Sequence, residues 1–233
     1  MSHPSSLPLY VRISEGLIRD IQAGRLIAGE RLPPERELAT SIGTSVGTLR
    51  KALADLEDRG LLERRQGSGN YVRETSGTTG VYAFFRLERP EGGGLPTADV
   101  LSVRTCPKPA GAPDFGAAPN AHRIRRIRSL DGLPVALEEI WLDGGQAKDL
   151  GAPDLSESLY HFYRTRLGLW IGRVEDRIGM DAAPAWTPER VPLEPGAPCG
   201  YVERIAWTAE GAPVEFSRTW FDSDSCRYTS RLR

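Results

Sequence analysis

Residues 32–53 read LPPERELATSIGTSVGTLRKAL, and this stretch decides the fold of the first third of the chain. A helix is expected to start near Pro34, because proline is well tolerated at the first helical position, and to stop near Gly43. Thr44 or Ser45 is then expected to cap a second helix. Its apolar residues fall on one helical face; they are Leu49, Ala52, Leu53 and Leu56. Two short helices joined by a tight turn predict a helix-turn-helix, whose second helix fits a DNA major groove.

A further helix is expected before this pair, and a β-hairpin after it. An apolar stripe at helical spacing predicts the first helix; it consists of Tyr10, Ile13, Leu17 and Ile21. Residues 61–65 and 70–73 are typical of two strands around the glycine-bearing tip 66–69, which predicts a wing. Arg64 and Arg65 stand beside glycines that let the backbone approach a groove or a phosphate.

The overall charge does not point to a nucleic-acid partner. The chain has 30 Lys and Arg residues against 31 Asp and Glu residues, so any basic footprint must be local. The cations that cluster where a winged helix meets DNA are Arg36, Arg50, Lys51, Arg64 and Arg65. The residues by themselves leave two interpretations open, a DNA-binding unit and a small structural three-helix unit.

Residues 7–73 as a whole resemble the N-terminal domain of the GntR family of bacterial transcription regulators. The segments that carry the resemblance are LPLY (7–10), GRLIAG (24–29), LPPERELA (32–39), TLRKAL (48–53), GLL (60–62) and QGSGNYV (66–72). The resemblance implies a winged helix-turn-helix that binds a short palindromic operator in double-stranded DNA as a homodimer.

The resemblance also implies individual DNA contacts. Arg36 and Arg50 are expected to contact DNA, and the guanidinium fork suits two bonds to guanine. Thr48 is expected to touch a phosphate or a base edge, and Gly67 and Gly69 to enter the minor groove. The full set expected to bind DNA is Arg36, Ser45, Thr48, Arg50, Lys51, Arg65, Gly67 and Gly69. The alternative for the two arginines is a solvated helix face or an ion pair within the helix.

Two departures from the family pattern concern the helix-turn-helix. Pro34 stands where the family usually has serine, so a capping hydroxyl worth about 1 kcal/mol is missing. Val46-Gly47 replaces a pattern that often holds arginine, and glycine inside a helix costs about 1 kcal/mol. Operator sequence and affinity are therefore expected to differ from the family norm.

The composition bounds the class of protein. Apolar residues make up 39% and charged residues 26%, as in ordinary soluble globular proteins. No apolar run reaches the roughly 18 residues of a membrane helix, and the start, MSHPSS, lacks signal-peptide features. The 3 cysteines, which have no CxxC spacing, suit a reducing compartment. A cytoplasmic protein with no membrane partner is expected.

The chain is expected to divide into two domains. The small polar stretch ETSGTTG at 74–80 is typical of a linker between a DNA-binding domain at 1–73 and a second domain at 81–233. In that domain, residues 123–142 and 201–221 each read as strand, acid-glycine turn and strand. Loops are expected at 89–96 and 106–119, a helix opening at Ser158, and a strand at 171–180. This predicts an α+β fold with an antiparallel sheet.

Residues 121–222 resemble the effector-binding UTRA domain of the HutC branch of the GntR family. The motifs that carry this resemblance are Arg126-x-Arg128 before Asp131-Gly132-x-Pro134, Ser158-Leu159-Tyr160, and Gly211-x-Pro213-Val214-Glu215-x-Ser217. The resemblance implies a fold like that of chorismate lyase and a small-molecule effector.

The resemblance implies that Arg126 and Arg128 hold the anionic end of a small metabolite. Residues two apart on a strand share a face, so both guanidiniums can form one carboxylate or phosphate clamp. The other expected effector residues are Glu138, Ser158, Tyr160, Glu215 and Phe221. Ion pairs on an exposed strand are the alternative for the arginines. Helix capping or structural pairing is the alternative for Glu138, Ser158, Tyr160 and Glu215.

Two features argue against a sugar phosphate as the effector. Relatives that bind phosphorylated sugars tend to carry tyrosine where Phe221 stands, and residues 86–90 do not match their hydroxyl-bearing stretch. The tryptophans could give a flat wall for a planar acid or belong to the core; they are Trp141, Trp170, Trp186, Trp207 and Trp220.

The function expected from these features is a ligand-responsive transcription repressor that works as a homodimer. One alternative is a DNA-binding protein whose second domain only dimerises, without an effector. The other is a lyase-like enzyme, although fold alone does not imply function. His3, His122 and His161 are scattered, and no nucleotide-binding or hydrolase motif is present. No catalytic residue, metal site or cofactor is expected.

Overall fold

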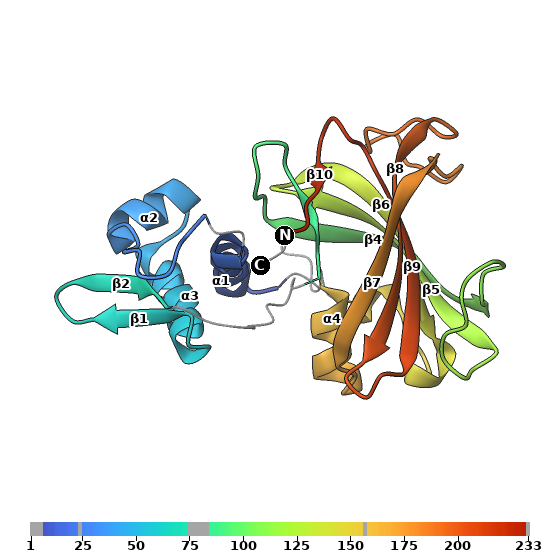
Figure 1. Cartoon of the computed structure of the whole chain (residues 1–233), viewed down its shortest axis with the longest axis horizontal. Coiled ribbons are helices and arrows are strands. Elements are labelled where there is room, and N and C mark those ends of the chain that lie inside the picture. Colours follow the sequence, from blue (N-terminus) through green and yellow to red (C-terminus); the bar gives the residue numbers. More distant parts are fainter. Residues whose placement is uncertain (1–6, 23–24, 74–83, 156–157, 232–233) are drawn as a thin grey trace. The chain divides into compact units, whose positions relative to one another are not determined.

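The computed structural model describes residues 7–22, 25–73, 84–155 and 158–231 (Figure 1). They group into two compact units, Leu7–Phe85 and Arg86–Thr229. The expected linker at 74–80 lies outside the described residues, so the domain boundaries given above stay a prediction. No helix in the described part of the chain is long and apolar enough to cross a membrane.

The N-terminal unit has the predicted order of three helices and a two-stranded wing. Its elements are α1 (Leu9–Gln22), α2 (Glu35–Ile42), α3 (Val46–Asp58), β1 (Leu62–Arg65) and β2 (Gly69–Val72). The apolar face expected on α3 is buried, and Leu49 and Leu56 are fully inaccessible to solvent. They pack against Ile18 of α1 and Val72 of β2 in one core. Burying each such leucine contributes about 1.5–3 kcal/mol.

The caps of α2 and α3 correct one detail of the sequence prediction. Helix α2 begins at Glu35, so Pro34 is the N-cap residue and not the first helical residue. The Pro34 carbonyl accepts a bond from Leu38 N at 3.0 Å, but no side chain caps the helix. Gly43 ends α2 in the left-handed conformation (φ 73°), which glycine adopts without strain. Ser45 caps α3, as one of the two residues expected there.

The C-terminal unit is built on a six-stranded antiparallel sheet with the order β4-β5-β6-β9-β8-β7. The strands are β4 (Pro96–Pro107), β5 (Asn120–Leu130), β6 (Leu133–Asp143), β7 (Ile171–Ala182), β8 (Pro198–Thr208) and β9 (Pro213–Phe221). A separate two-stranded sheet pairs β3 (Leu87–Glu88) with β10 (Arg227–Tyr228). The short helical segments are Gly144–Gln146, Ala152–Asp154, α4 (Leu159–Phe162) and the π-helical turn Tyr163–Leu167. The predicted α+β class is confirmed.

Both predicted hairpins are present. Strands β5 and β6 meet at Asp131 (φ 50°) and Gly132 (φ 82°), and both positive φ values suit a tight turn between twisted strands. Strands β8 and β9 pair across a turn that contains Gly211 (φ 89°). The sequence did not predict β4, and the loop expected from Cys106 begins only after Pro107, because both residues still pair with β5.

The sheet register defines two faces. Residues directly opposite each other on antiparallel strands share a face. One such row crosses the sheet and defines what we call the Arg126 face; it contains Arg126, Glu138, Thr219, Val202 and Ile178. The opposite face holds apolar clusters around Trp220 and Phe216, to which Val191 and Phe115 contribute from the β7–β8 and β4–β5 connections. Both faces carry charged side chains, because a row on the opposite face contains Arg125, Glu139, Arg218 and Glu203.

Candidate functional site

The recognition helix α3 carries three of the residues predicted to bind DNA. Lys51 is exposed, Thr48 is half-buried, and the Arg50 side chain is 61% exposed. Arg50 Nε donates to Oε2 of Glu35 on α2 at 2.6 Å. The other oxygen of the same carboxylate lies 3.9 Å from Nη2 of Arg64 on β1. Glu35, which the sequence reasoning did not single out, therefore links the recognition helix to the wing.

Two further predicted residues lie at the helix starts. Arg36 is exposed in the first turn of α2. Ser45 Oγ accepts a bond from Thr48 N at 3.1 Å and shares a hydrogen bond of 2.8 Å with Thr48 Oγ1. A hydroxyl both donates and accepts, so this pair keeps one hydrogen that can be donated to a phosphate oxygen. The serine is thus a cap whose geometry is compatible with the DNA contact expected of it.

The wing presents a cation and two glycines. The Arg65 guanidinium lies 4.3 Å from the ring centre of Tyr71, and its Nη2 is 3.2 Å from the Glu63 carboxylate. Gly67 (φ 73°) and Gly69 (φ 121°) have backbone conformations that favour glycine. A Cβ on Gly67 would meet nothing within 4 Å, so the backbone of the tip is open to a narrow groove at that residue.

On the Arg126 face, the two arginines predicted to bind the effector meet a carboxylate. Arg126 Nε donates to Oε2 of Glu138, and Arg128 Nε lies 3.7 Å from Oε1 of the same residue. All three residues are buried, so the alternative of ion pairs on an exposed strand is only half right. Burial raises the pKa of Glu138, but the charges of Arg126 and Arg128 more than offset it and hold the pKa below its ordinary value.

A second carboxylate on this face is held by two phenols. Tyr160 Oη donates to Oε1 of Glu215 at 2.9 Å, and Tyr163 Oη donates to Oε2 at 2.6 Å. Burial raises the pKa of Glu215, and burial together with the Glu215 carboxylate raises the pKa of both tyrosines. Tyr163 was not predicted, because it lies in the π-helical turn that continues α4 and brings a second phenol to the sheet.

A third pair on the Arg126 face was missed by sequence reasoning. Arg204 of β8 makes two bonds to Asp176 of β7, at 2.5 and 2.6 Å, and Tyr228 Oη donates to the same carboxylate. Burial raises the pKa of Asp176, but the Arg204 bonds outweigh it and the pKa is lowered. Arg204 lies between the buried Val202 and Ala206 on the same face of β8. A cation at a position where the strand pattern predicts a buried apolar residue was the signal that could have revealed this ion pair.

The remaining predicted effector residues have packing roles in this structure. Ser158 is buried and caps α4, because its Oγ accepts from His161 N at 3.3 Å. Phe221 packs over Gly200 on the same face, where a Cβ on the glycine would meet the Phe221 ring at 2.4 Å. Trp141 and Trp220 are buried on the opposite face and do not wall the Arg126 face.

The structure therefore brings the predicted effector residues of three strands together on one face. Three guanidiniums, from Arg126, Arg128 and Arg204, lie there beside three carboxylates and three phenols. Guanidiniums bind carboxylate or phosphate groups through paired hydrogen bonds, and carboxylates accept bonds from hydroxyls. The face is chemically suited to a small polyhydroxylated anion.

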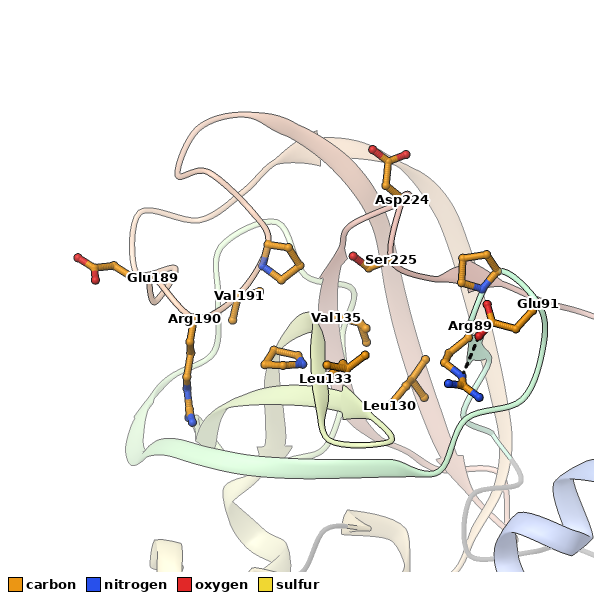
Figure 2. A pocket seen from close by; sticks show the side chains of 13 residues that line it. Arg89, Glu91, Leu130, Leu133, Val135, Glu189, Arg190, Val191, Asp224 and Ser225 are labelled. Carbon is orange, nitrogen blue, oxygen red and sulfur yellow. Dashed lines mark ion pairs between the residues drawn. The ribbon is translucent and has the colours of Figure 1, made fainter. Parts of the chain in front are cut away.

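A pocket of about 590 Å³ lies elsewhere in the C-terminal unit, at the β5–β6 turn (Figure 2). Its floor is apolar and includes Leu130, Leu133 and Val135. At its rim Arg89 Nε lies 3.3 Å from the Glu91 carboxylate. The residues that line this pocket include none of the predicted effector residues. No group of three potential metal ligands occurs among the described residues.

Comparisons with known proteins agree with the two units. The family described as "Bacterial regulatory proteins, gntR family" matches residues 9–72, and the UTRA domain family matches residues 91–227. The transcriptional regulator SmoD of Agrobacterium fabrum is 54% identical, over 98% of this chain and 97% of its own length. The transcriptional repressor NagR of Bacillus subtilis is 26% identical, over 97% of this chain and 94% of its own.

A solved structure gives the same result for the C-terminal unit. The ligand-binding domain of a protein described as a GntR-family regulator, from Bordetella bronchiseptica, superposes with a TM-score of 0.57. It is 26% identical and covers 64% of this chain and 98% of its own. GntR regulators bind DNA, and their UTRA domains bind small-molecule effectors. The chain belongs to the GntR family of bacterial transcription regulators, in the HutC-type branch with a UTRA domain, and it is not an enzyme.

Proposed function

We propose that the protein is a ligand-responsive repressor that binds a palindromic operator as a homodimer. In this proposal a small anionic metabolite binds the Arg126 face and changes the affinity for DNA. The repressor NagR, similar to this chain over nearly its whole length, supports the direction of control. Because the proposed target is operator DNA of a bacterium, we place the protein in the cytoplasm.

The observation that carries the effector assignment is the burial of two arginines on one face. Arg126 and Arg128 are 6% and 2% exposed, and both charges are beside Glu138. Burying ion pairs is expensive, and apolar replacements of similar volume are often as stable or more so. A binding role accounts for this cost, because the same guanidiniums can exchange Glu138 for a ligand anion.

The DNA assignment is supported by the exposed cations of α2, α3 and the wing. An effector can control this surface only if it binds the DNA-competent and DNA-incompetent states of the dimer with different affinities. A palindromic operator has two half-sites, and each needs one winged helix, so the proposal requires a dimer. We infer that the C-terminal sheet carries the dimer contact.

The DNA half of the proposal is tested by selection from a random duplex library at one moderate salt concentration. We expect enrichment of a short inverted repeat, and its loss in Arg50→Ala. Arg25→Ala is the matched control, since Arg25 is a cation of the N-terminal unit whose Nη2 lies 2.6 Å from Oδ1 of Asp20. A failure of the wild-type protein to enrich any sequence, together with a monomeric sedimentation coefficient, would contradict the proposal.

The effector half is tested with pairs of sugar acids or sugar phosphates and their uncharged parent sugars. We expect saturable thermal stabilisation by a charged member only, and its loss in Arg126→Gln and in Arg128→Gln. Arg104→Gln is the control, because Arg104 is an exposed cation on β4. If no charged compound stabilises the protein while the operator is still bound, the second domain only dimerises and the effector proposal is wrong.

A further inference from the structure

The wing is joined by an isolated β-bridge at Arg31 that the sequence reasoning did not anticipate. Arg31 forms a bridge with Tyr71 of β2. Around it, Leu32 N donates to Asn70 O and Val72 N donates to Glu30 O, both at 2.9 Å. These bonds hold the backbone of Arg31 on both sides, so its position relative to the wing is fixed.

The Arg31 side chain lies along the base of the wing tip. A Cβ placed on Gly69 would be 3.1 Å from Arg31 Nε and 3.6 Å from its Nη2. The guanidinium therefore rests closely against the α carbon of Gly69. The resemblance assigned Gly69 to minor-groove entry; the structure shows a second reason for a glycine there, which is to give the arginine room.

Arg31 also lines a crevice of about 640 Å³ between the wing and the start of α2. Its other charged lining residues are Glu35, Glu57, Arg64 and Arg65. Arg64 lies near Glu35, and Arg65 is paired with Glu63. In the described part of the chain, no carboxylate oxygen is within 4.0 Å of a nitrogen of Arg31. Arg31 is thus an exposed cation, fixed in place, whose charge no described side chain neutralises at close range.

We propose that Arg31 binds a phosphate of the DNA backbone in this crevice, next to the base of the wing. The inference rests on the DNA binding proposed above and adds a residue to it. Half to two-thirds of protein–DNA hydrogen bonds go to phosphate and sugar, and such contacts set register without reading sequence. A backbone-anchored arginine suits that role, because little conformational freedom is lost when it binds.

The test is the salt dependence of binding to a labelled duplex of scrambled sequence, followed by fluorescence anisotropy. The slope of log K against log salt is negative, and each phosphate contact that is lost reduces its magnitude by about 0.9. We expect that loss in Arg31→Gln, whereas Arg31→Lys keeps the charge and therefore the slope. Arg25→Gln is the matched control, with an unchanged slope, since Arg25 already pairs with Asp20. Unchanged melting temperatures would show that the variants are folded.

The outcomes separate this inference from the proposal beneath it. If the wild-type protein binds duplex and Arg64→Gln lowers the slope while Arg31→Gln does not, the assignment of Arg31 is wrong and DNA binding stands. If the wild-type protein binds no duplex at any salt concentration, both proposals are wrong. Equal losses across scrambled and selected sequences in Arg31→Gln would support a phosphate contact over base readout.

Discussion

The carboxylate of Glu35 on α2 accepts a hydrogen bond from Arg50 Nε on α3 at 2.6 Å, across 15 residues of sequence. It also lies 3.9 Å from Arg64 on the wing. One acidic side chain thus partly neutralises two cations that face DNA in the proposed function. It also fixes the direction of the Arg50 guanidinium before DNA is bound.

We expect Glu35→Gln to change affinity and selectivity in opposite directions. Removing the charge frees Arg50 and Arg64 for phosphates, so affinity for scrambled duplex should rise about two- to fivefold, the scale of an exposed ion pair. Selectivity should fall, because Arg50 is no longer oriented. Anisotropy with scrambled and selected duplexes at one salt concentration measures both. Glu37→Gln is the control, since Glu37 is in the same turn and forms neither ion pair. Equal behaviour of the two variants would refute this role of Glu35.

Two glycines of the helix-turn-helix should respond oppositely to alanine. A Cβ on Gly47 would meet only Ser45 Oγ, at 3.9 Å, so Gly47→Ala should stabilise the protein by about 0.5–1 kcal/mol. Gly43 has φ 73°, so Gly43→Ala should destabilise it by about 1 kcal/mol. Urea unfolding followed by the helical circular dichroism signal measures both changes. A loss of stability in Gly47→Ala would show that α3 does not have the described conformation.

An ion pair with a buried carboxylate links helix α1 to the C-terminal end of helix α3. Arg59 Nη1 is 2.6 Å from the Glu15 carboxylate, and the Glu15 side chain is fully inaccessible to solvent. Arg59→Ala should cost about 2 kcal/mol, because it removes a cation from a buried carboxylate while Arg59 itself is partly exposed. Arg59→Ala/Glu15→Gln should lose less than the sum of the single changes. Additive losses in urea unfolding would mean that the two residues are not coupled.

Stability should depend on pH through Glu215. Burial raises its pKa in the folded state above the ordinary value near 4.5, so the folded state binds the proton more tightly than the unfolded chain. This contribution is complete below the unfolded pKa and is lost as pH rises through the folded pKa. Wild-type protein should therefore lose stability relative to Glu215→Gln as pH rises above about 4.5.

The difference between these two proteins isolates Glu215, because both contain Asp176 and Glu138, whose contributions cancel. The pKa values of Asp176 and Glu138 are lowered, so these residues act on stability with the opposite sign. They stabilise above their unfolded pKa, and this contribution is lost as pH falls through the folded pKa. Chemical unfolding at a series of pH values measures the difference. A constant difference between wild type and Glu215→Gln across the acid range would mean that the Glu215 carboxyl does not titrate differently in the two states.

Much of the fold could be predicted from local patterns. The apolar face of α3, the turn at Asp131-Gly132 and the alternation in β8 and β9 are each determined by residues close in sequence. Strand β4 was missed, because polar residues and an irregularity between Val100 and Ser102 obscure its alternation. Its membership of the sheet depends on β5, which lies beside it only after folding.

The sequence by itself determined the two-domain class, the family and the strand that carries Arg126 and Arg128, since these depend on contiguous motifs. Only the tertiary structure decided which charges meet. Glu35 reaches Arg50, Tyr163 reaches Glu215, and Arg204 reaches Asp176 across separations of 15, 52 and 28 residues. Such pairs follow from strand register and helix packing, which arise from the burial of the whole core. No local pattern encodes them, and the sites depend on them.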